Sequence, residues 1–466
     1  MDPILLARAQ FALTVMFHFV FPAITIGLGL LIAILETFRW RTGREVYDRA
    51  AAFWTKLFAL TFAVGVATGV VMEFQFGTNW AAYSKFVGDI FGSPLAAEAI
   101  FAFFLESAFL GLLLFGGARI SSRLRWFAAV MVALGSTLSA FWIVVADSWM
   151  QTPAGYTIVD GRARLTDFWA AVFNPSTMPR FIHTVVSAWA VGAFLMVGVA
   201  AWFLLRRRHL AVARTSIVLG ITVALITSGL MFLTGDVSAR EVAHEQQAKF
   251  AAMQGLYETT SGADMVIFSL PPAQNPADAF QGPAIVVTRL LSFLSFGSFD
   301  AVIKGLQAFP PSSWPPVALT FLAYHNMVVI GTLMLLVMVA LAWFAWRRSL
   351  MRHPNWLRLA VAVTPLPLIA QQLGWMTAEV GRQPWVVYDV MRTSQGVSTA
   401  VSGADVLVSL LLLVVVYALL GTLWLYLLRR EIVHGPEPVM TEVDEEAPVA
   451  EQDAARTRRG LTARGA

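Results

Sequence analysis

The stretch "FALTVMFHFVFPAITIGLGLLIAILE", residues 11–36, is almost wholly apolar and contains no lysine or arginine. A helix of about 20 such residues is long enough to cross the hydrocarbon core of a bilayer. Peptide groups that face lipid find no water, so they must be satisfied inside a helix. Comparable apolar runs recur along the chain, and we therefore predict an all-α polytopic membrane protein.

The composition supports this class of protein. The 466 residues are 58% hydrophobic and 13% charged, with a mean hydropathy of +0.67, whereas a soluble domain is about half apolar and a quarter charged. The absence of cysteine excludes disulfides, thiolate metal sites and iron–sulfur clusters held by this chain. The first residues carry neither a basic region nor a small-residue cleavage site, so we expect a first span and not a signal peptide.

The apolar runs predict about nine transmembrane helices, near residues 11–36, 53–76, 94–117, 126–149, 181–205, 216–234, 317–343, 357–380 and 404–428. Every second connector is dense in lysine and arginine, and the positive-inside rule makes these connectors cytoplasmic. We therefore expect the N-terminus outside and the C-terminus in the cytoplasm. These basic anchors also explain the net charge of +4, which gives no support to nucleic-acid binding.

The chain divides into four predicted regions. Residues 1–234 hold helices one to six with candidate metal ligands and acidic residues, and residues 317–430 hold helices seven to nine. Residues 235–316 form a long extracytoplasmic loop, which we expect to bind a ligand, with a solvated lid as the alternative. Residues 431–466 are rich in Glu, Pro and Ala, and we predict a disordered cytoplasmic tail.

Four side chains able to coordinate a metal lie near the outer ends of separate predicted spans: His18, His183, Met327 and Glu379. Polar groups in hydrocarbon are costly and are functional candidates by default. Imidazole, thioether and carboxylate groups fit haem iron, but a mixed ring could also hold copper or zinc. Taken singly, a membrane histidine is more often a helix–helix hydrogen bond, and a methionine is more often core filler.

Acidic residues form a second set of candidates. Glu98 and Glu106 of the third span are eight residues apart, which is about 12 Å of rise and about 80° of rotation on an α-helix. Glu73 ends the second span. Buried carboxylates prefer the neutral form, and a chain of them relays protons in membrane proteins. The alternative is that each one caps or bridges helices.

Five motifs along the chain resemble the large subunit (subunit I) of the cytochrome bd quinol oxidases, of the type with a short quinol loop. They are "RAQFALTVMFHFVFPAITIGL" at 8–28, "MEFQFGTNW" at 72–80, "FFLESAFLGL" at 103–112, "NPSTMPRFIHTV" at 174–185 and "GWMTAEVGRQPW" at 374–385. The resemblance implies a terminal oxidase of a bacterial respiratory chain. Such an enzyme oxidises quinol at the outer face and reduces dioxygen to water through three haems, with protons taken from the cytoplasm.

The resemblance also implies the haem ligands. His18 matches the ligand of a high-spin haem at the oxygen site, and Glu379 matches the carboxylate that serves the high-spin haem b. His183 and Met327 match the axial ligands of the low-spin haem b. The expected cofactors are therefore two haems b with haem d, or with a third haem b in its place.

Further roles follow from the same resemblance. Glu98 and Glu106 match an acidic pair tied to haem d and proton delivery, and Trp375 matches an aromatic residue between haems. Arg382 is expected to balance a haem propionate or Glu379, and Arg8 resembles a basic group near the haems.

The long loop resembles the quinol-binding loop of the family, with Lys249 at the place of its lysine. Gln254 stands where the family usually carries a glutamate, and an amide cannot take a proton from quinol as a carboxylate can. Glu258, one helical turn further on, is a candidate substitute. His325 stands where arginine is common, and we expect it to compete as a ligand or to bond a propionate.

The expected substrate is ubiquinol or menaquinol, and the expected place is the bacterial inner membrane. The expected partners are a second membrane subunit (subunit II) and, as a further candidate, a small single-span subunit. Two alternatives stay open. One is a bd-like haem protein with an altered electron donor, and the other is a proton or cation transporter, for which we find no clear internal repeat.

Overall fold

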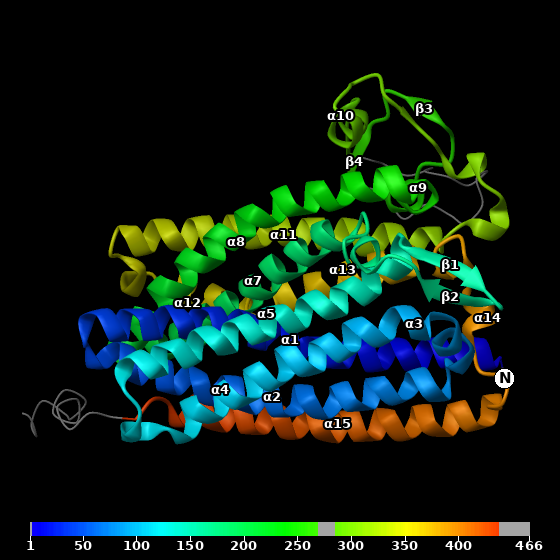
Figure 1. Ribbon diagram of the computed structural model, residues 1–466. Helices are drawn as coiled ribbons and strands as arrows, with labels where there is room; N and C mark the ends of the chain where they lie inside the picture. The colour runs from blue at the N-terminus through cyan, green and yellow to red at the C-terminus, as the bar shows by residue number, and fades with distance from the viewer. Residues whose placement is uncertain (1, 269–284, 438–466) are drawn as a thin grey trace, which may run out of the picture.

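The protein is an elongated helical bundle in a computed structural model that describes residues 2–268 and 285–437 (Figure 1). Within these residues, nine helices are long and apolar enough to cross a membrane, which confirms the predicted fold class. Single helices form seven of these spans: α1 (Pro3–Thr42), α2 (Glu45–Thr78), α5 (Ser122–Gln151), α7 (Thr177–Leu205), α8 (Leu210–Glu245), α11 (Val317–Trp346) and α15 (Gly403–His434). The predicted tail from residue 438 onward lies outside the described residues.

The ends of α1 show how local sequence sets a helix boundary. The side chain of Asp2 accepts a hydrogen bond from the backbone N–H of Ile4 at 2.9 Å, which satisfies one of the free donors of the first turn. At the other end Gly43 adopts a φ of 64°, a left-handed conformation that glycine takes without a Cβ penalty. The helix is therefore longer at both ends than its apolar run.

The third span is built from three helical pieces. It runs from α3 (Ala81–Ala97) through the π-helix η1 (Glu98–Phe103) into α4 (Phe104–Phe115). The connector expected before residue 94 is helical in the structure, because α3 follows α2 with only two residues between them. A π-turn is rare and frequently marks a functional site, and this one begins at a predicted proton-path residue, Glu98.

The eighth span is also interrupted. It consists of α12 (Pro354–Ala362) and α13 (Leu366–Val380). Pro365 lies between them, and proline has no N–H to continue the hydrogen-bond ladder of a helix. The second piece, α13, carries Trp375 and Glu379.

Short elements gather at the end of the bundle that holds the N-terminus (Figure 1). The predicted loop begins as helix, because α8 continues to Glu245 and α9 (Gln247–Gln254) follows at once. The described residues form four two-stranded antiparallel sheets, which pair β1 (Tyr156–Val159) with β2 (Arg162–Leu165), β3 (Thr260–Ser261) with β6 (Val302–Ile303), β4 (Met265–Phe268) with β5 (Ile285–Val287), and β7 (Trp385–Val387) with β8 (Met391–Arg392). Short helices complete this end: α6 (Phe168–Val172), α10 (Leu290–Phe296) and α14 (Thr393–Gly396).

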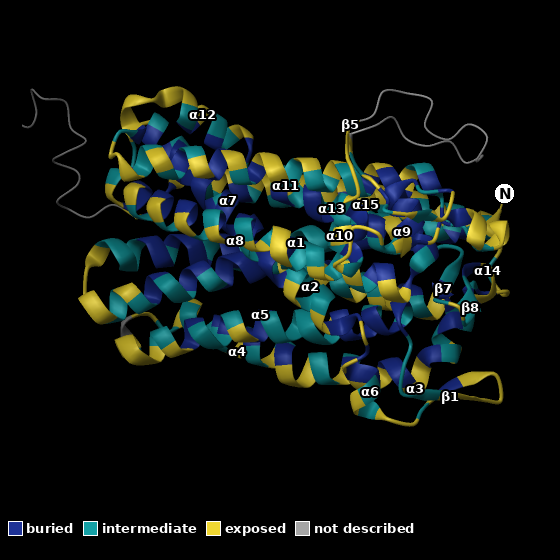
Figure 2. Ribbon diagram, turned by 90° about the horizontal axis from the view of Figure 1, so that it is seen from above, coloured by how far each residue is buried: buried dark blue, intermediate teal, exposed yellow. Residues whose placement is uncertain are grey.

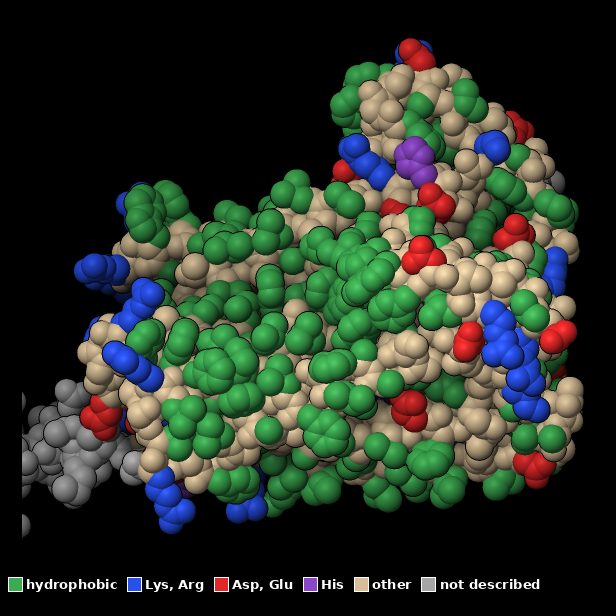
Figure 3. Space-filling model, in the orientation of Figure 1, with side chains coloured by type: hydrophobic (Ala, Val, Ile, Leu, Met, Phe, Trp, Pro, Cys, Tyr) green, Lys and Arg blue, Asp and Glu red, His purple; other side chains and the backbone are tan. Residues whose placement is uncertain are grey.

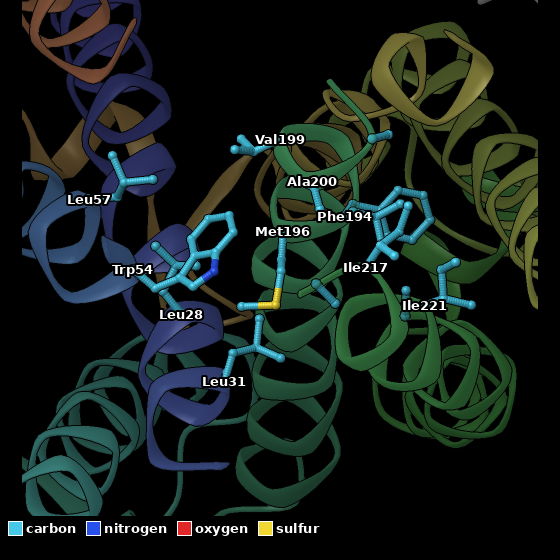
Figure 4. Packing of buried hydrophobic residues seen from close by; sticks show 14 of the residues in the cluster. Leu28, Leu31, Trp54, Leu57, Phe194, Met196, Val199, Ala200, Ile217 and Ile221 are labelled. Atoms are coloured by element: carbon cyan, nitrogen blue, oxygen red, sulfur yellow. The ribbon is translucent and has the colours of Figure 1, made fainter. Parts of the chain in front are cut away.

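The largest buried cluster lies among α1, α2, α7 and α8 (Figure 4). Trp54 is 1% exposed, and its Nε1 donates to Oγ of Ser216 at 3.1 Å, so the buried indole is fully used. Lipid tails are as apolar as leucine, so close packing and not water exclusion holds membrane helices together. Gly27 and Gly192 allow α1 and α7 to pack closely, since a Cβ on Gly27 would lie 2.7 Å from the Cα of Gly192.

Burial and chemistry vary along and around the bundle. Dark, buried residues follow the inward faces of the helices (Figure 2). The helix α15 is largely exposed. Hydrophobic side chains cover the middle of the molecule, and most charged side chains gather near its two ends (Figure 3). This arrangement is what a bilayer requires of a spanning protein.

Candidate functional site

His18 and His183 each contact a threonine of the following helix. Nδ1 of His18 on α1 lies 2.9 Å from Oγ1 of Thr68 on α2, and Nδ1 of His183 on α7 lies 2.8 Å from Oγ1 of Thr234 on α8. Among the described residues, neither Nε2 atom has a hydrogen-bond partner. Each imidazole therefore keeps one nitrogen for a ligand.

Met327 of α11 packs against α13. A Cβ placed on Gly374 would lie 2.9 Å from Sδ of Met327. The next residue, Trp375, stacks on Phe19 with ring centroids 5.6 Å apart. Phe19 follows His18 in the chain, so Trp375 lies between the neighbourhoods of His18 and Met327.

Two glutamines of α13 tie that helix to α1 and α7. Nε2 of Gln372 donates to the carbonyl oxygen of Met16 at 2.8 Å, two residues before the histidine of α1. Nε2 of Gln371 donates to Oγ of Ser187 at 2.7 Å, one turn beyond the histidine of α7. The helix that carries Glu379 is thereby fixed against both histidine helices.

Glu379 lies at the end of α13 in a cluster of charged and amide side chains. Oε1 accepts a hydrogen bond from Nε2 of Gln151 at 2.9 Å, and Oε2 accepts from Nη2 of Arg382. Nη2 of Arg180 lies 3.7 Å from Oε1 and pairs with Asp147. Because each carboxylate oxygen has two lone pairs, Glu379 retains capacity for a further partner.

Lys249 of α9 reaches the same cluster from the predicted loop. Its side chain is only 2% exposed, and Nζ donates to Oε1 of Gln151 and to Oε1 of Gln246, both at 3.0 Å. Burial, assisted by the charge of Arg180, lowers the pKa of Lys249 to about 7. Since Gln151 also bonds Glu379, hydrogen bonds connect the lysine of the loop to the carboxylate of α13.

The glutamine and glutamate of the loop lie in different environments. Gln254 is buried and hydrogen-bonds Tyr324, one turn before Met327. Glu258 follows Gly255, the residue that ends α9, and is exposed. The expected substitute carboxylate therefore faces solvent, whereas the amide is buried near a predicted ligand.

His325 serves a different purpose from the one expected. Nδ1 lies 3.0 Å from the carbonyl oxygen of Phe321, and Nε2 lies 3.1 Å from that of Val266 on β4. With both nitrogens directed at carbonyl oxygens, no lone pair is directed at a metal. His325 instead fastens a strand of the loop to α11.

The two acidic residues of the third span both bond to α5. Ser136 donates to Oε1 of Glu106, and Oγ of Ser139 donates to Oε1 of Glu98 at 2.7 Å. Gly135 allows this approach, since a Cβ there would lie 2.9 Å from that of Glu106. The two carboxyl groups thus bond to serines that lie three residues apart on the same helix, α5.

The π-helix explains why Glu98 and Glu106 share a partner helix. A π-turn contains about one residue more than an α-turn, so it removes about 100° of the rotation expected between them. The angle between Glu98 and Glu106 about the helix axis therefore changes from the predicted value of about 80° to about 20° in the opposite direction. The α-helical estimate of the angle was therefore wrong, because a π-turn lies between the two residues.

Glu73 and Arg8 are less enclosed. Glu73 is exposed on α2, beside Phe74, whose side chain is 70% exposed. Arg8 is half-buried on α1 and forms no ion pair with any residue in 2–268 or 285–437. Neither residue is drawn into the cluster around Glu379.

Buried hydrogen-bond donors that lack an acceptor indicate whether a haem fits this site. Within the described chain, Nε1 of Trp80, the hydroxyl of Tyr83 and Nε of Arg382 are buried and have no hydrogen-bond partner. Buried donors are rarely left unpaired, and the propionate groups of a haem are acceptors. Copper or zinc held by a ring of side chains fits less well, because no three His, Cys, Asp or Glu of the described residues gather as a metal site. The residues present therefore fit a haem.

Sequence reasoning missed several members of the site. Asp147 and Arg180 pair with each other at Glu379, and Gln151 bridges Glu379 to Lys249. Asp147 is an acid inside the predicted span 126–149, and Arg180 precedes the fifth span within a quoted motif. The rule that charged residues in spans are functional candidates applies to Asp147, whereas Arg180 is marked only by its place in that motif. No comparable signal marks Gln151, Thr68 or Thr234.

The fold and the site define a class of protein: a polytopic helical membrane protein in which imidazole, thioether and carboxylate groups, the kinds of group that ligate haem iron, lie on helices joined through α13. The family model of the cytochrome bd terminal oxidase subunit I matches residues 6–436. The chain belongs to this family, and it is therefore a subunit of a terminal respiratory oxidase.

Relatives cover nearly the entire chain. Cytochrome bd ubiquinol oxidase subunit 1 of Bacillus subtilis is 38% identical, over 94% of this chain and 95% of that protein. Cytochrome bd-II ubiquinol oxidase subunit 1 of Escherichia coli is 35% identical, over 95% of this chain and 98% of that protein. The solved structure of bd oxidase from Geobacillus thermodenitrificans superposes with a TM-score of 0.86 at 31% identity, covering 93% of this chain and 99% of that one.

Proposed function

We propose that this chain is the haem-bearing subunit of a quinol:oxygen oxidoreductase, with His183 and Met327 holding a low-spin haem and with His18 and Glu379 serving the high-spin haems. The family is a cytochrome family, so haem is the implied cofactor. Bound haem iron supplies one-electron transfer and the binding of dioxygen. The observation that carries the proposal is the unpartnered Nε2 of each histidine, beside a helix that also touches Met327 and carries Glu379.

The proposed electron donor is a quinol. Two relatives are named ubiquinol oxidases, and a third, 34% identical, is named a putative menaquinol oxidase. In this chain, Lys249 and Gln254 are the residues proposed to take part in quinol oxidation. Gln254 cannot accept a proton through its amide, but neutral Lys249 can, and Gln151 connects it to Glu379.

The proposed proton path uses Glu106 and Glu98. Each carboxyl group accepts a hydrogen bond from a serine of α5, so each is held in place while it takes up or releases a proton. The arrangement also fits the alternative of helix bridging, which involves no proton transfer. The two roles differ in their response to Glu106→Gln, as argued below.

We further propose that the chain lies in the bacterial inner membrane beside a second membrane subunit. The relatives are named as first subunits, which implies others. Glu73 and Phe74 of α2 are exposed, and so are Phe101 of η1 and Phe104 of α4. A carboxylate facing lipid is costly, so a partner subunit is proposed to cover Glu73.

The ligand proposal is tested by optical spectroscopy of the purified complex. His183→Ala and Met327→Ala should each remove the low-spin haem b signal from reduced-minus-oxidised spectra and leave the high-spin signals. Glu379→Ala should disturb the high-spin signals and leave the low-spin one. A low-spin spectrum that persists in His183→Ala or Met327→Ala would refute that ligand pair.

A further inference from the structure

The contacts of the two histidines with threonine follow one pattern. Thr68 and Thr234 contact Nδ1 of the histidine that lies 50 and 51 residues earlier in the chain. Glycine follows each threonine, and a Cβ at Gly69 or Gly235 would lie 3.3 Å or 3.5 Å from Cε1 of the same imidazole. The threonine holds one ring nitrogen, and the glycine makes room for the ring.

Hydrogen-bond directions decide which ring nitrogen carries the proton. Oγ1 of Thr68 lies 3.0 Å from the carbonyl oxygens of Val64 and Gly65, so its one hydroxyl hydrogen is donated within α2. When that hydrogen stays within α2, Oγ1 of the threonine accepts from His18, and Nδ1 carries the hydrogen. In a neutral imidazole Nε2 is then the unprotonated nitrogen, and only that form can bind a metal through Nε2.

Thr234 repeats the arrangement with a longer contact. Its hydroxyl lies 3.5 Å from the carbonyl oxygen of Met231, which gives the same direction with a weaker bond. The hydroxyl hydrogen of Thr234 is therefore bonded less strongly to its own helix than the hydroxyl hydrogen of Thr68. Serine in place of threonine would preserve either contact, and valine would remove it with little change of shape.

The recurrence is a property of a repeated structural unit. His18 and His183 each stand nine residues before a glycine, and these two glycines, Gly27 and Gly192, meet where α1 and α7 cross. The helix pairs α1–α2 and α7–α8 thus carry the histidine, the threonine and the crossing glycine at matching places. Because the same histidine–threonine contact occurs in both helix pairs, chance does not explain it adequately.

We propose that Thr68 and Thr234 are positioning residues, each of which selects the Nδ1-protonated tautomer of its histidine and directs Nε2 to the iron of a separate haem. The inference rests on the proposed haem ligands. A partner that orients a metal-binding histidine typically contributes about 10–100-fold in metal affinity or activity. Loss of the acceptor also makes the imidazole a weaker donor to iron, which disfavours the oxidised state and raises the midpoint potential.

The test uses the assembled oxidase with Thr68→Val and Thr234→Val. Matched controls are Thr55→Val on α2 and Thr227→Val on α8, because among the described residues these hydroxyls bond only to carbonyl oxygens of their own helices. Haem content, optical spectra and redox titrations are measured for each variant. Thr234→Val should raise the midpoint potential of the low-spin haem alone, and Thr68→Val that of the haem bound by His18 alone. Retention of each haem should weaken by about 10-fold or more.

Serine variants complete the test. Thr68→Ser and Thr234→Ser should keep wild-type potentials, and a valine variant that loses its haem while its serine and control counterparts keep theirs also supports the proposal. Wild-type potential and haem content in both valine variants would overturn it. So would equal changes at all haems, or equal changes in the controls, because a general packing defect would produce them. The ligand assignments would survive that outcome, since His183→Ala tests them separately.

Discussion

Lys249 changes protonation within the ordinary pH range because it is buried. Its ammonium loses its proton as the pH rises through about 7. Neutral Lys249 is the form able to accept a proton from quinol, so we predict that quinol-driven oxygen uptake rises with pH across this point. Lys249→Arg should remove that rise, because arginine stays charged. A rise that persists unchanged in an oxygen-electrode assay of Lys249→Arg would exclude the lysine.

The same residue predicts a pH dependence of stability. The pKa of Lys249 falls from its ordinary value of 10.5 to about 7 on folding. Between these values the unfolded chain binds the extra proton, so the free energy of unfolding should increase with pH across this window. Thermal unfolding of Lys249→Met should show a smaller increase than the wild type. Identical pH dependence in the two proteins would show that burial does not perturb this amine.

Substitution of Glu106 distinguishes a role in proton transfer from a role in helix bridging. An amide at this position can still accept the hydrogen bond from Ser136 but cannot carry a proton through neutral and ionised forms. Glu106→Gln should therefore lower oxygen-reduction turnover by about 10²-fold or more, as the loss of an acid–base group does, while the haem spectra persist. Ser107→Ala is the control, because within residues 2–268 and 285–437 that hydroxyl bonds only to the carbonyl oxygen of Phe103 on the preceding turn. Wild-type turnover in Glu106→Gln would leave helix bridging as its only role.

At the scale of elements, α13 organises the site. Its glutamines bond to α1 and α7, its glycine receives Met327 of α11, and its last turn carries Glu379. Pro365 lies between α13 and the preceding helix α12. Sequence periodicity predicts one continuous span here, because an apolar pattern does not reveal where a helix is interrupted.

Gly374 tests the contact between α11 and α13. A Cβ at this position would lie 2.9 Å from Sδ of Met327, closer than side chains tolerate, so the thioether must move. Gly374→Ala should convert the low-spin haem signal to a high-spin one in optical and electron paramagnetic resonance spectra. Gly331→Ala is the control, since in the described part of the chain the added methyl group would meet no atom within 4 Å beyond its chain neighbours and the backbone of its own helix. An unchanged low-spin signal in Gly374→Ala would place Met327 away from the iron.

At the scale of the whole molecule, the two ends of the bundle differ. The N-terminus and the short strands lie at one end, and α15 ends at the other (Figure 1). An odd number of spans requires this separation. The basic connectors predict that the end without the strands faces the cytoplasm.

The natural absence of cysteine makes this orientation easy to test. A single cysteine replaces Val159 in the β1–β2 hairpin or Arg44 between α1 and α2, both of which are exposed. A membrane-impermeant maleimide should label Val159→Cys in intact cells and Arg44→Cys only after lysis. The reverse pattern would invert the topology and place quinol oxidation on the other face.

The sequence alone determined the class of fold and the chemistry of the ligands. Apolar runs of bilayer length must form helices, and imidazole, thioether and carboxylate groups within them are too costly to lack a function. Tertiary structure alone decided which groups meet. The contact of Thr68 with His18, the bridge of Gln151 and the burial of Lys249 join segments far apart in the chain. Such contacts depend on how helices pack, and helix packing leaves no periodic pattern in the sequence.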